Sequence, residues 1–435
     1  MKHFLVPILS IGMLHAQQFP TFSDTLQNGL IVIACEKPGN GIAEFEVWYK
    51  TGSKDETDGI RGMAHMFEHM MFRGSKNFPG DGDVFLKAIE DLGGNVNAYT
   101  DFDRAVYHET VPVQTLNTVF AMEADRMENL TLNQNVLDVE REVVGEELRN
   151  GQNNWFQKMA NESHSLLYPE GHPYAVDVIG YLPEILQFTV KQCQDFYDKY
   201  YSPNNAFLIV VGDVKHEEIF QQAENTFGKI TKQLPAHVMN NIPTLDSFKL
   251  RAVDLPVDLP VQIYNYIIPS PAANSADAAA FNFFKSLVFI GQHSILQSRL
   301  INREHAVYGI LDYTEGDRLY PYQSTIAFVM PATVGNAKVK KIVAMEIESI
   351  IEEGIDTDDL NTFLNNLRSN QLMTQYDVSA IAGEIGLAQF YHQDYRLAFH
   401  LADVYEKISS QQLQAVAAKY FSPEKIQVIN VKPSW

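Results

Sequence analysis

A sequence segment near residue 200 recurs 220 residues later, and this repetition constrains the fold more than any other feature of the chain. The pentapeptide KYYSP begins at Lys199, and KYFSP begins at Lys419. Each is preceded by a glutamine, Gln192 or Gln412, and followed by an apolar stretch that predicts a strand. Proline after an aromatic pair ends a helix, because proline cannot donate the next backbone hydrogen bond. Both halves are therefore predicted to contain a helix, a stop and a strand in the same register.

The starts of the two halves correspond in the same way. Residues 44–49 alternate polar and apolar side chains, which predicts a half-buried strand, and a helix follows from near Gly62. In the second half, residues 261–268 predict the matching strand and residues 277–289 the matching helix. We therefore interpret the chain as a diverged duplication.

Two homologous domains account for a chain of 435 residues, of which 46% are hydrophobic. We place the first domain at 17–230 and the second at 248–435, because residues 231–247 include the prolines and polar residues typical of a linker. No glycine-rich phosphate loop follows a strand, which argues against a nucleotide-binding fold. We expect the α+β class, with a mainly antiparallel sheet in each domain and helices packed on one face of that sheet.

The first 16 residues have the features of a secretory signal peptide. Lys2 supplies a positive charge, residues 4–14 form an apolar stretch, and Ala16 is a small residue suited to cleavage. We therefore expect export across the inner membrane, to the periplasm. No later stretch is long and apolar enough to span a bilayer. The net charge of −21 argues against nucleic acid and anionic membranes as partners.

The chain contains two cysteines, Cys35 and Cys193. Two cysteines are too few for a disulfide framework, even in an exported protein. Cys193 corresponds to Leu413 in the repeat, so we expect it to be a small side chain of the core. Whether the two cysteines pair is left open by the sequence.

The first half carries a metal-binding pattern at residues 65–69. His65 and His69 lie four residues apart, and therefore share one face of a helix with Glu68. Two imidazoles at this spacing bind Zn²⁺, and the glutamate beside them can act as the general base of a hydrolase. Histidine and glutamate on a helix are usually only solvated, but here the neighbours are methionines and phenylalanines. The helix is therefore expected to be buried, and its ionisable groups need a partner such as a metal.

A third zinc ligand is expected from a second helix, because catalytic zinc sites use three protein ligands and leave one position open. Residues 139–150 carry four glutamates, which are Glu140, Glu142, Glu146 and Glu147. Glu140 and Glu147 are two turns apart and share a face, so one can bind the metal while the other orients a histidine ring. Spacing alone does not separate Glu147 from Glu146. For Glu142 and Glu146, an exposed and solvated position is the simpler interpretation.

Both segments resemble those of a known family. Residues 62–74 are similar to the zinc helix of the pitrilysin, insulin-degrading enzyme and mitochondrial processing peptidase family, and residues 140–148 to its second metal helix. The resemblance implies that Glu147 is the third zinc ligand and that Glu140 is the supporting carboxylate. It covers essentially the whole chain after the signal segment. The family architecture it implies is two similar α+β domains per chain, with two chains or fused halves closing as a clamshell.

Residues 93–100 resemble the edge strand at which that family binds substrate. The resemblance implies that Asn97, Ala98 and Tyr99 contact an extended peptide, which adds to the sheet as a further strand. Pairing of this kind gives affinity through the main chain and makes little demand on the side chains of the substrate. We therefore expect peptide substrates of varied sequence.

The second half lacks the metal pattern, because at the same offset the metal positions fall on Lys285, Val288 and Phe289. Members of the family use an arginine and a tyrosine from such a domain, seven residues apart, to hold the substrate carbonyl. The tyrosine position falls on Tyr308, whereas the arginine position falls on Ile301. Arg299 and Arg303 lie two residues to either side, where a short gap in the alignment would be needed to bring one of them into place. We therefore expect a homologous subunit to supply the Arg/Tyr pair in a heterodimer. A homodimer with an altered pair is the alternative.

The combined features predict a zinc-dependent endopeptidase that cleaves peptides or unfolded segments in an enclosed chamber, with Glu68 as general base. The alternative is a catalytically silent protein, either a peptide-binding protein or a structural core subunit of a larger complex. A silent subunit is expected to lose metal residues, and in this chain His65, His69 and Glu147 are all retained together with Glu68.

Overall fold

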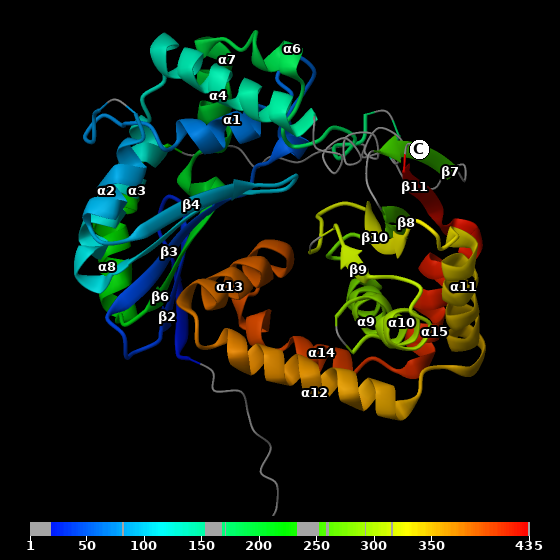
Figure 1. The fold of residues 1–435 in the computed structure, drawn as a ribbon. Helices are drawn as coiled ribbons and strands as arrows, with labels where there is room; N and C mark the ends of the chain where they lie inside the picture. Colours follow the sequence, from blue (N-terminus) through cyan, green and yellow to red (C-terminus); the bar gives the residue numbers. More distant parts are fainter. Residues whose placement is uncertain are drawn as a thin grey trace, which may run out of the picture.

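The computed structural model contains two β-sheets, each with its own set of helices (Figure 1). It describes residues 19–80, 82–152, 168–169, 171–232, 252–257, 261–291, 293–314 and 316–433. The expected signal segment and most of the expected linker lie outside the described residues. Within these ranges, no helix is long and apolar enough to cross a membrane.

The first sheet has six strands in the spatial order β1-β2-β6-β3-β5-β4. Only β2 and β6 pair in parallel, and every other neighbouring pair is antiparallel. Among the described residues β4 is an edge strand, and no other described strand pairs with its outer side. The strand bounds are β1 (Thr21–Thr25), β2 (Ile31–Glu36), β3 (Ile42–Tyr49), β4 (Asn95–Thr100), β5 (Ala105–Pro112) and β6 (Ala206–Gly212).

The second sheet repeats this topology with five strands in the order β7-β11-β8-β10-β9. Its one parallel pair is β7 with β11, which corresponds to β2 with β6 in the first sheet. The strand order matches that of the first sheet once β1 is left out, so the α+β duplication expected from the sequence is confirmed. The bounds are β7 (Ala252–Val257), β8 (Val261–Ser270), β9 (Gly309–Asp312), β10 (Tyr322–Pro331) and β11 (Gln427–Pro433).

Helices pack on the sheets in both halves. Those of the first half are α1 (Met63–Met70), α2 (Val84–Asp91), α3 (Leu116–Asn129), α4 (Gln134–Gln152), α6 (Leu182–Ile185), α7 (Val190–Tyr200) and α8 (His216–Asn225). Those of the second half are α9 (Ala278–Phe289), α10 (Ile295–Gln297), α11 (Asn336–Glu353), α12 (Thr357–Thr374), α13 (Val378–His392), α14 (Leu401–Glu406) and α15 (Ser410–Val416).

The repeated residues also form the same local structure. The start of α7 is a capping box made by Thr189 and Gln192, and the start of α15 is a capping box made by Ser409 and Gln412. In each box the hydroxyl accepts a backbone N–H that the helix itself cannot satisfy. The two helices therefore begin at equivalent positions, and each is followed by the corresponding strand, β6 after α7 and β11 after α15.

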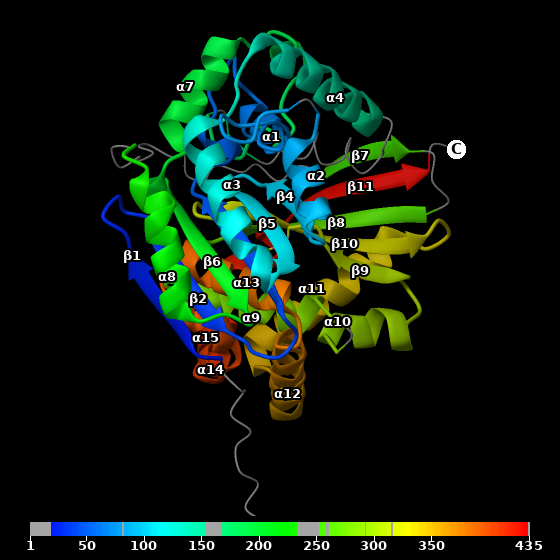
Figure 2. The ribbon, with the colours of Figure 1, turned by 90° about the vertical axis from the view of Figure 1, so that its left-hand side faces the viewer.

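The first core lies between one face of the first sheet and the helices of the first half. Figure 2 shows α3 and α8 running across that face. Alternate residues of β3, from Ala43 to Tyr49, point into this core together with the apolar side of α1. The arrangement follows from the two-residue period of a strand, which places every second side chain on the same face.

The opposite face of the first sheet is covered by α13, a helix of the second half (Figure 1). Trp48, Phe207 and Ile209 from the sheet are buried against Ile381 and Ile385 of this helix. The prediction of a half-buried strand at 44–49 is therefore wrong, since β3 is buried on both faces from Ala43 to Tyr49. The first sheet has helices on both faces, and one of these helices comes from the other half.

Polar contacts also join the halves just beyond the end of β4. Asp103 accepts hydrogen bonds from the backbone N–H of Leu319 at 2.9 Å and from the hydroxyl of Tyr174 at 2.7 Å. The guanidinium of Arg318 lies 3.6 Å from the carboxylate of Asp101. The second half therefore holds the loop that follows the edge strand of the first sheet.

Candidate metal centre

Helix α1 presents three polar side chains on one side and apolar side chains on the others. His65, Glu68 and His69 are partly buried, whereas the apolar residues of the helix are fully buried in the first core, these being Met63, Ala64, Met66, Phe67 and Met70. The polar side of the helix packs toward α4. The spacing read from the sequence therefore gives the shared face that was expected.

Glu147 on α4 brings a carboxylate to both histidines. Its Oε2 lies 3.8 Å from Nε2 of His65 and 3.5 Å from Nε2 of His69. One donor atom from each of the three residues lies within 4.8 Å of the other two. Zinc bonds of about 2.0–2.2 Å in tetrahedral geometry require ligand atoms roughly 3.3–3.6 Å apart. This donor set therefore fits a zinc ion with little movement of the side chains.

The surroundings favour the metal-binding forms of His65 and Glu147, the neutral imidazole and the ionised carboxylate, whereas His69 is held toward its protonated form by the two glutamates beside it. Burial lowers the pKa of His65, and the negative charge of Glu68 offsets this only in part. Burial acts in the same direction on His69, but the interaction with Glu147 and the charge of Glu140 raise the pKa of His69 overall. The same contact with His69 lowers the pKa of Glu147, which keeps that carboxylate ionised.

Glu140 lies behind His69 and is almost completely buried, with 1% of its side chain exposed. One carboxylate oxygen is 3.6 Å from Nδ1 of His69, and the other accepts from Nε of Arg73. Arg73 also lies 3.2 Å from the carboxylate of Asp83. An orienting carboxylate of this kind fixes the tautomer and direction of a metal-binding histidine. His69 thus lies between two glutamates that are two helical turns apart.

The remaining glutamates of α4 point away from the histidines. Glu142 is exposed, and Glu146 pairs with Arg149 while 62% of its side chain remains exposed. Of the four candidate glutamates, the structure therefore places Glu140 and Glu147 beside the histidines. Spacing alone could not separate Glu147 from Glu146. Sequence reasoning missed Arg73 as the partner of Glu140, although Arg73 lies shortly after the end of α1 and within residues 62–74, the segment that resembles the family's zinc helix.

The edge strand β4 lies beside α1 and carries the residues expected to bind substrate. Asn97 is exposed, Ala98 is buried on the side of α1, and Tyr99 is 38% exposed. The backbone N–H of Ala98 donates to Oδ1 of Asn97 at 2.9 Å. Tyr99 packs edge-on against Trp48, with ring centroids 6.3 Å apart, and burial raises the pKa of Tyr99 to about 12. A role for these three residues in substrate binding stays a prediction.

The second half replaces the metal residues by a buried ion pair and apolar packing. On α9, Lys285 lies 2.9 Å from the carboxylate of Asp312, and Val288 and Phe289 are buried in the second core. No group of potential ligands occurs among the described residues of this half.

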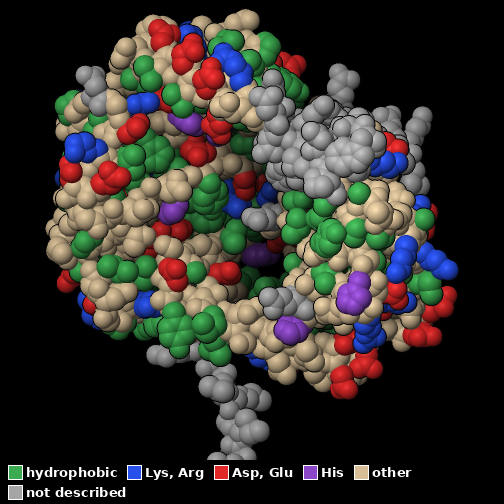
Figure 3. All heavy atoms as spheres, in the orientation of Figure 1, with side chains coloured by type: hydrophobic (Ala, Val, Ile, Leu, Met, Phe, Trp, Pro, Cys, Tyr) green, Lys and Arg blue, Asp and Glu red, His purple; other side chains and the backbone are tan. Residues whose placement is uncertain are grey.

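Residues at the expected arginine and tyrosine positions lie in different surroundings. Ile301 packs against the second core, and Arg299 beside it is paired with Glu346. Tyr308 is 67% exposed and precedes β9, which lies on the side of the second half that is turned toward β4 (Figure 1). Figure 3 shows a hollow between the two halves. The chain therefore presents the tyrosine without an arginine seven residues before it.

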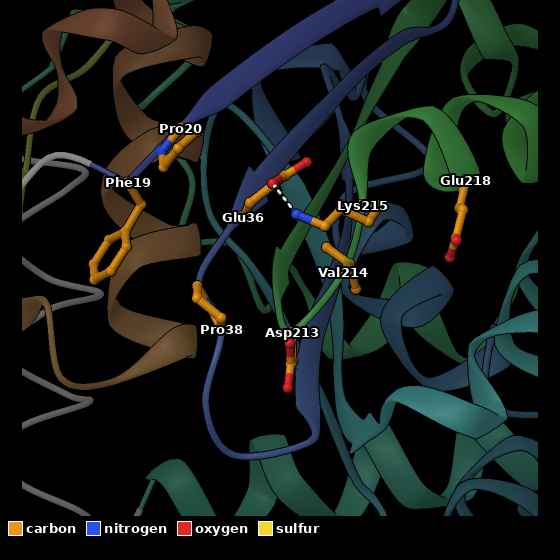
Figure 4. Close-up of a pocket in the computed structure, with 8 residues that line it drawn as sticks. All are labelled: Phe19, Pro20, Glu36, Pro38, Asp213, Val214, Lys215 and Glu218. Atoms are coloured by element: carbon orange, nitrogen blue, oxygen red, sulfur yellow. Dashed lines mark hydrogen bonds and ion pairs between the residues drawn. The ribbon is translucent and has the colours of Figure 1, made fainter.

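A second group of potential ligands lies at the far side of the first sheet, at Glu36, His216 and Glu217. Figure 4 shows Glu36 and Lys215 beside a cavity of about 430 Å³. Glu36 accepts from Lys215 Nζ at 2.8 Å and from the backbone N–H of His216 at 3.1 Å. These contacts lower the pKa of Glu36 to about 2. Glu36 therefore accepts a backbone hydrogen bond at the start of α8, and we assign no metal to this group of residues.

The two cysteines are free and buried. Burial raises the pKa of the Cys35 and Cys193 thiols to about 11 in each case. Cys193 lies in the first core, as its match with Leu413 predicted, and Leu413 lies in the second. Neither thiol contributes to the candidate metal centre.

The family model described as "Insulinase (Peptidase family M16)" matches residues 31–172, and that described as "Peptidase M16 inactive domain" matches residues 187–367. The chain is 29% identical to the zinc protease PqqE of Helicobacter pylori over 411 residues, which cover 88% of this chain and 89% of that protein.

Solved structures show the same fold. The crystal structure of a protease from Helicobacter pylori matches with a TM-score of 0.84 and 25% identity, covering 95% of this chain and all of that one (100%). The first half of the periplasmic protease PqqL from Escherichia coli matches with a TM-score of 0.76 and 20% identity, covering 96% of this chain and 93% of that one.

Proposed function

The chain belongs to the insulinase family of peptidases, family M16, and on this premise we propose that it is a zinc-dependent endopeptidase. The observation that carries the proposal is the convergence of His65, His69 and Glu147 from two helices, at separations that suit one zinc ion. The donor set of two imidazoles and one carboxylate is that of a catalytic zinc site, which leaves a position open for reaction.

In the proposed reaction the chain's own residues supply the proton transfers and the binding. Bound zinc would supply Lewis-acid chemistry toward the scissile carbonyl and toward the attacking water. Glu68 takes the proton from the attacking water and later gives a proton to the leaving amine. Glu140 keeps the ring of His69 in its orientation while Arg73 fixes Glu140. The peptide is held as an added strand along β4.

Zinc content and two glutamine variants test this proposal. The wild-type chain, after zinc repletion and removal of loose metal, is expected to hold about one zinc ion and to cleave peptides. Glu68→Gln is expected to keep the zinc and to lose cleavage about 10²- to 10⁴-fold, because the proton acceptor is lost. Glu142→Gln, on the exposed side of α4, is the matched control and should change neither. Full cleavage by Glu68→Gln would refute the proposed mechanism.

The proposal includes a homologous second subunit that supplies the Arg/Tyr pair, with a homodimer as the alternative. Two observations support it. Ile301, at the expected arginine position, packs against the second core, and the guanidinium of Arg299 is paired with Glu346. Mixing the purified chain with a homologous chain that carries the pair tests this point. Cleavage of a mixed peptide library only in the mixture supports the heterodimer, and full activity of the chain alone contradicts it.

We place the mature protein in the periplasm as part of the same proposal. The support is the signal-like segment at residues 1–16, together with the periplasmic location stated for the related protease PqqL of Escherichia coli. Cell fractionation of the full-length chain, with N-terminal sequencing of the product, tests it. Recovery of an unprocessed chain in the cytoplasm would contradict it.

A further inference from the structure

Helix α1 begins without a capping side chain of its own. Its N-cap residue is Gly62, at φ 98°, which has no side chain to accept the free N–H groups of the first turn. Both oxygens of Glu56 take that place. Oε2 accepts from the N–H of Gly62 at 2.8 Å, and Oε1 accepts from the N–H of Ala64 at 2.8 Å. The start of the metal helix is therefore held by a carboxylate from a preceding turn.

Close contact with another loop explains why the cap comes from elsewhere in the chain. A Cβ atom on Gly62 would lie 2.7 Å from the carbonyl oxygen of Ile179, and one on Gly180 would lie 2.4 Å from the N and Cα atoms of Gly62. Serine, threonine or aspartate, the usual N-cap residues, are thereby excluded at position 62. The two backbones can approach this closely only because both positions are glycine.

Glu56 is itself fixed on every side. It is 5% exposed, its N–H donates to the carbonyl of Ser53 at 3.2 Å, and its own carbonyl accepts from Arg61 at 2.9 Å. Burial raises the pKa of Glu56 to about 8, although the N–H groups of Gly62 and Ala64 act in the opposite direction. The N–H of Arg61 is held in turn by Glu184 at 2.7 Å. The entry to α1 is thus fixed by two carboxylates and a glycine contact.

The position of α1 decides whether the metal ligands meet. Ala64, which Glu56 holds, directly precedes His65, and His69 follows one turn later. Glu147 lies on a separate helix, α4, which packs against α1. A shift of α1 relative to α4 by roughly 1 Å would change the separations of 3.8 and 3.5 Å between Glu147 and the two histidines, which now lie close to the roughly 3.3–3.6 Å that zinc requires.

We propose that Glu56 is a positioning residue for the metal centre, which holds the first turn of α1 where His65 and His69 meet Glu147. This inference rests on the proposed zinc-dependent function but concerns a residue outside the ligand set. It also assigns a purpose to a buried carboxylate that lies outside the metal site and has no part in the proton transfers.

The test compares zinc affinity in Glu56→Gln and in a matched control. The amide of glutamine accepts only one of the two N–H groups and presents its NH₂ to the other. Glu36→Gln is the control, because Glu36 also accepts a backbone N–H at a helix start but lies away from the metal site. Competition between apo-protein and a chromogenic chelator measures the zinc dissociation constant, and thermal unfolding of the same samples reports on stability.

Glu56→Gln is expected to weaken zinc binding about 10- to 100-fold, the range found when groups that support metal ligands are removed. Glu36→Gln is expected to lower thermal stability while changing zinc affinity less than about twofold. If Glu56→Gln does not fold, Glu56→Asp gives the comparison, since it keeps the charge but is one CH₂ too short to reach both N–H groups. Partial recovery of affinity in Glu56→Asp relative to Glu56→Ala would support the role.

Two results are distinguishable. Tight zinc binding by the wild type and equal binding by the folded Glu56 variant would overturn the role of Glu56 and leave the proposed function intact. A wild-type chain that binds no zinc after repletion would overturn the proposed function, and this inference with it.

Discussion

Replacing Gly386 by alanine tests the packing of α13 against the first sheet. An added Cβ at this position would lie 2.0 Å from Cζ2 and 2.3 Å from Cε2 of Trp48. Carbon atoms pack at about 3.5–4.0 Å, so the helix or the indole must move by roughly 1.5 Å. Overpacking of this kind costs about 1–3 kcal/mol.

The same helix offers a matched control at Gly383. A Cβ added there meets nothing within 4 Å, so only the intrinsic gain of alanine over glycine in a helix remains. That gain is about 0.5–1 kcal/mol. Since both variants receive it, the difference between Gly386→Ala and Gly383→Ala isolates the clash. We expect the free energy of unfolding to be lower in Gly386→Ala than in Gly383→Ala by about 1–3 kcal/mol.

Urea unfolding of the two variants, followed by tryptophan fluorescence and by circular dichroism, measures this difference. A smaller side chain at position 48 provides a second check, because Trp48→Leu should make room for the methyl group and reduce the penalty of Gly386→Ala. Equal stability of the two alanine variants would refute the packing of α13 on the first sheet. It would also remove the explanation for the burial of both faces of β3.

Three further outcomes follow from the described contacts. Glu140→Gln should weaken zinc binding about 10- to 100-fold in a chelator competition, because His69 loses its orienting carboxylate, and unchanged affinity would contradict this. Arg126→Met should lower the free energy of unfolding by about 3–5 kcal/mol, because two buried glutamates lose their guanidinium, and a loss below about 1 kcal/mol in urea unfolding would contradict it. The pKa of Glu36 is lowered to about 2 by Lys215, so the stability it contributes is present above its usual pKa and is lost as pH falls toward 2. The gap in melting temperature between wild type and Glu36→Gln should therefore shrink from pH 6 to pH 3, and a constant gap would argue against the ion pair.

The features that the sequence predicted are those whose signals are local. The shared face of His65, Glu68 and His69 follows from helical spacing, and the end of α7 at Tyr200 follows from the proline at position 203. The repeated segments then predicted the second half, because corresponding segments follow in the same order along both halves. The second sheet accordingly has the strand order of the first sheet without β1. Local periodicity was sufficient to predict a contact where the two residues lie within one helical turn or on neighbouring strands.

The features that the sequence did not predict depend on contacts across long separations. Periodicity marks Trp48 as a residue that faces a side of the sheet, but it does not reveal that a helix more than 300 residues later covers that side. The contact of Asp103 with Leu319 and the hydrogen bonds of Glu56 with the start of α1 are likewise absent from any local pattern. Charged residues in polar segments are usually solvated, so burial alone distinguishes these carboxylates, and burial is a property of the whole fold.

The apolar helix α9 has a consequence for how the first half would relate to the zinc ion proposed for it. The second half reaches the same topology with Lys285, Val288 and Phe289 where the first half carries histidines and a glutamate. An ion pair and apolar packing occupy these positions, so we expect this architecture to fold without an ion. Metal loading and folding are then separate events, in contrast to zinc fingers, where they are one. A chelator should empty the first half without unfolding it, and the ion present would be set by supply and exchange after synthesis.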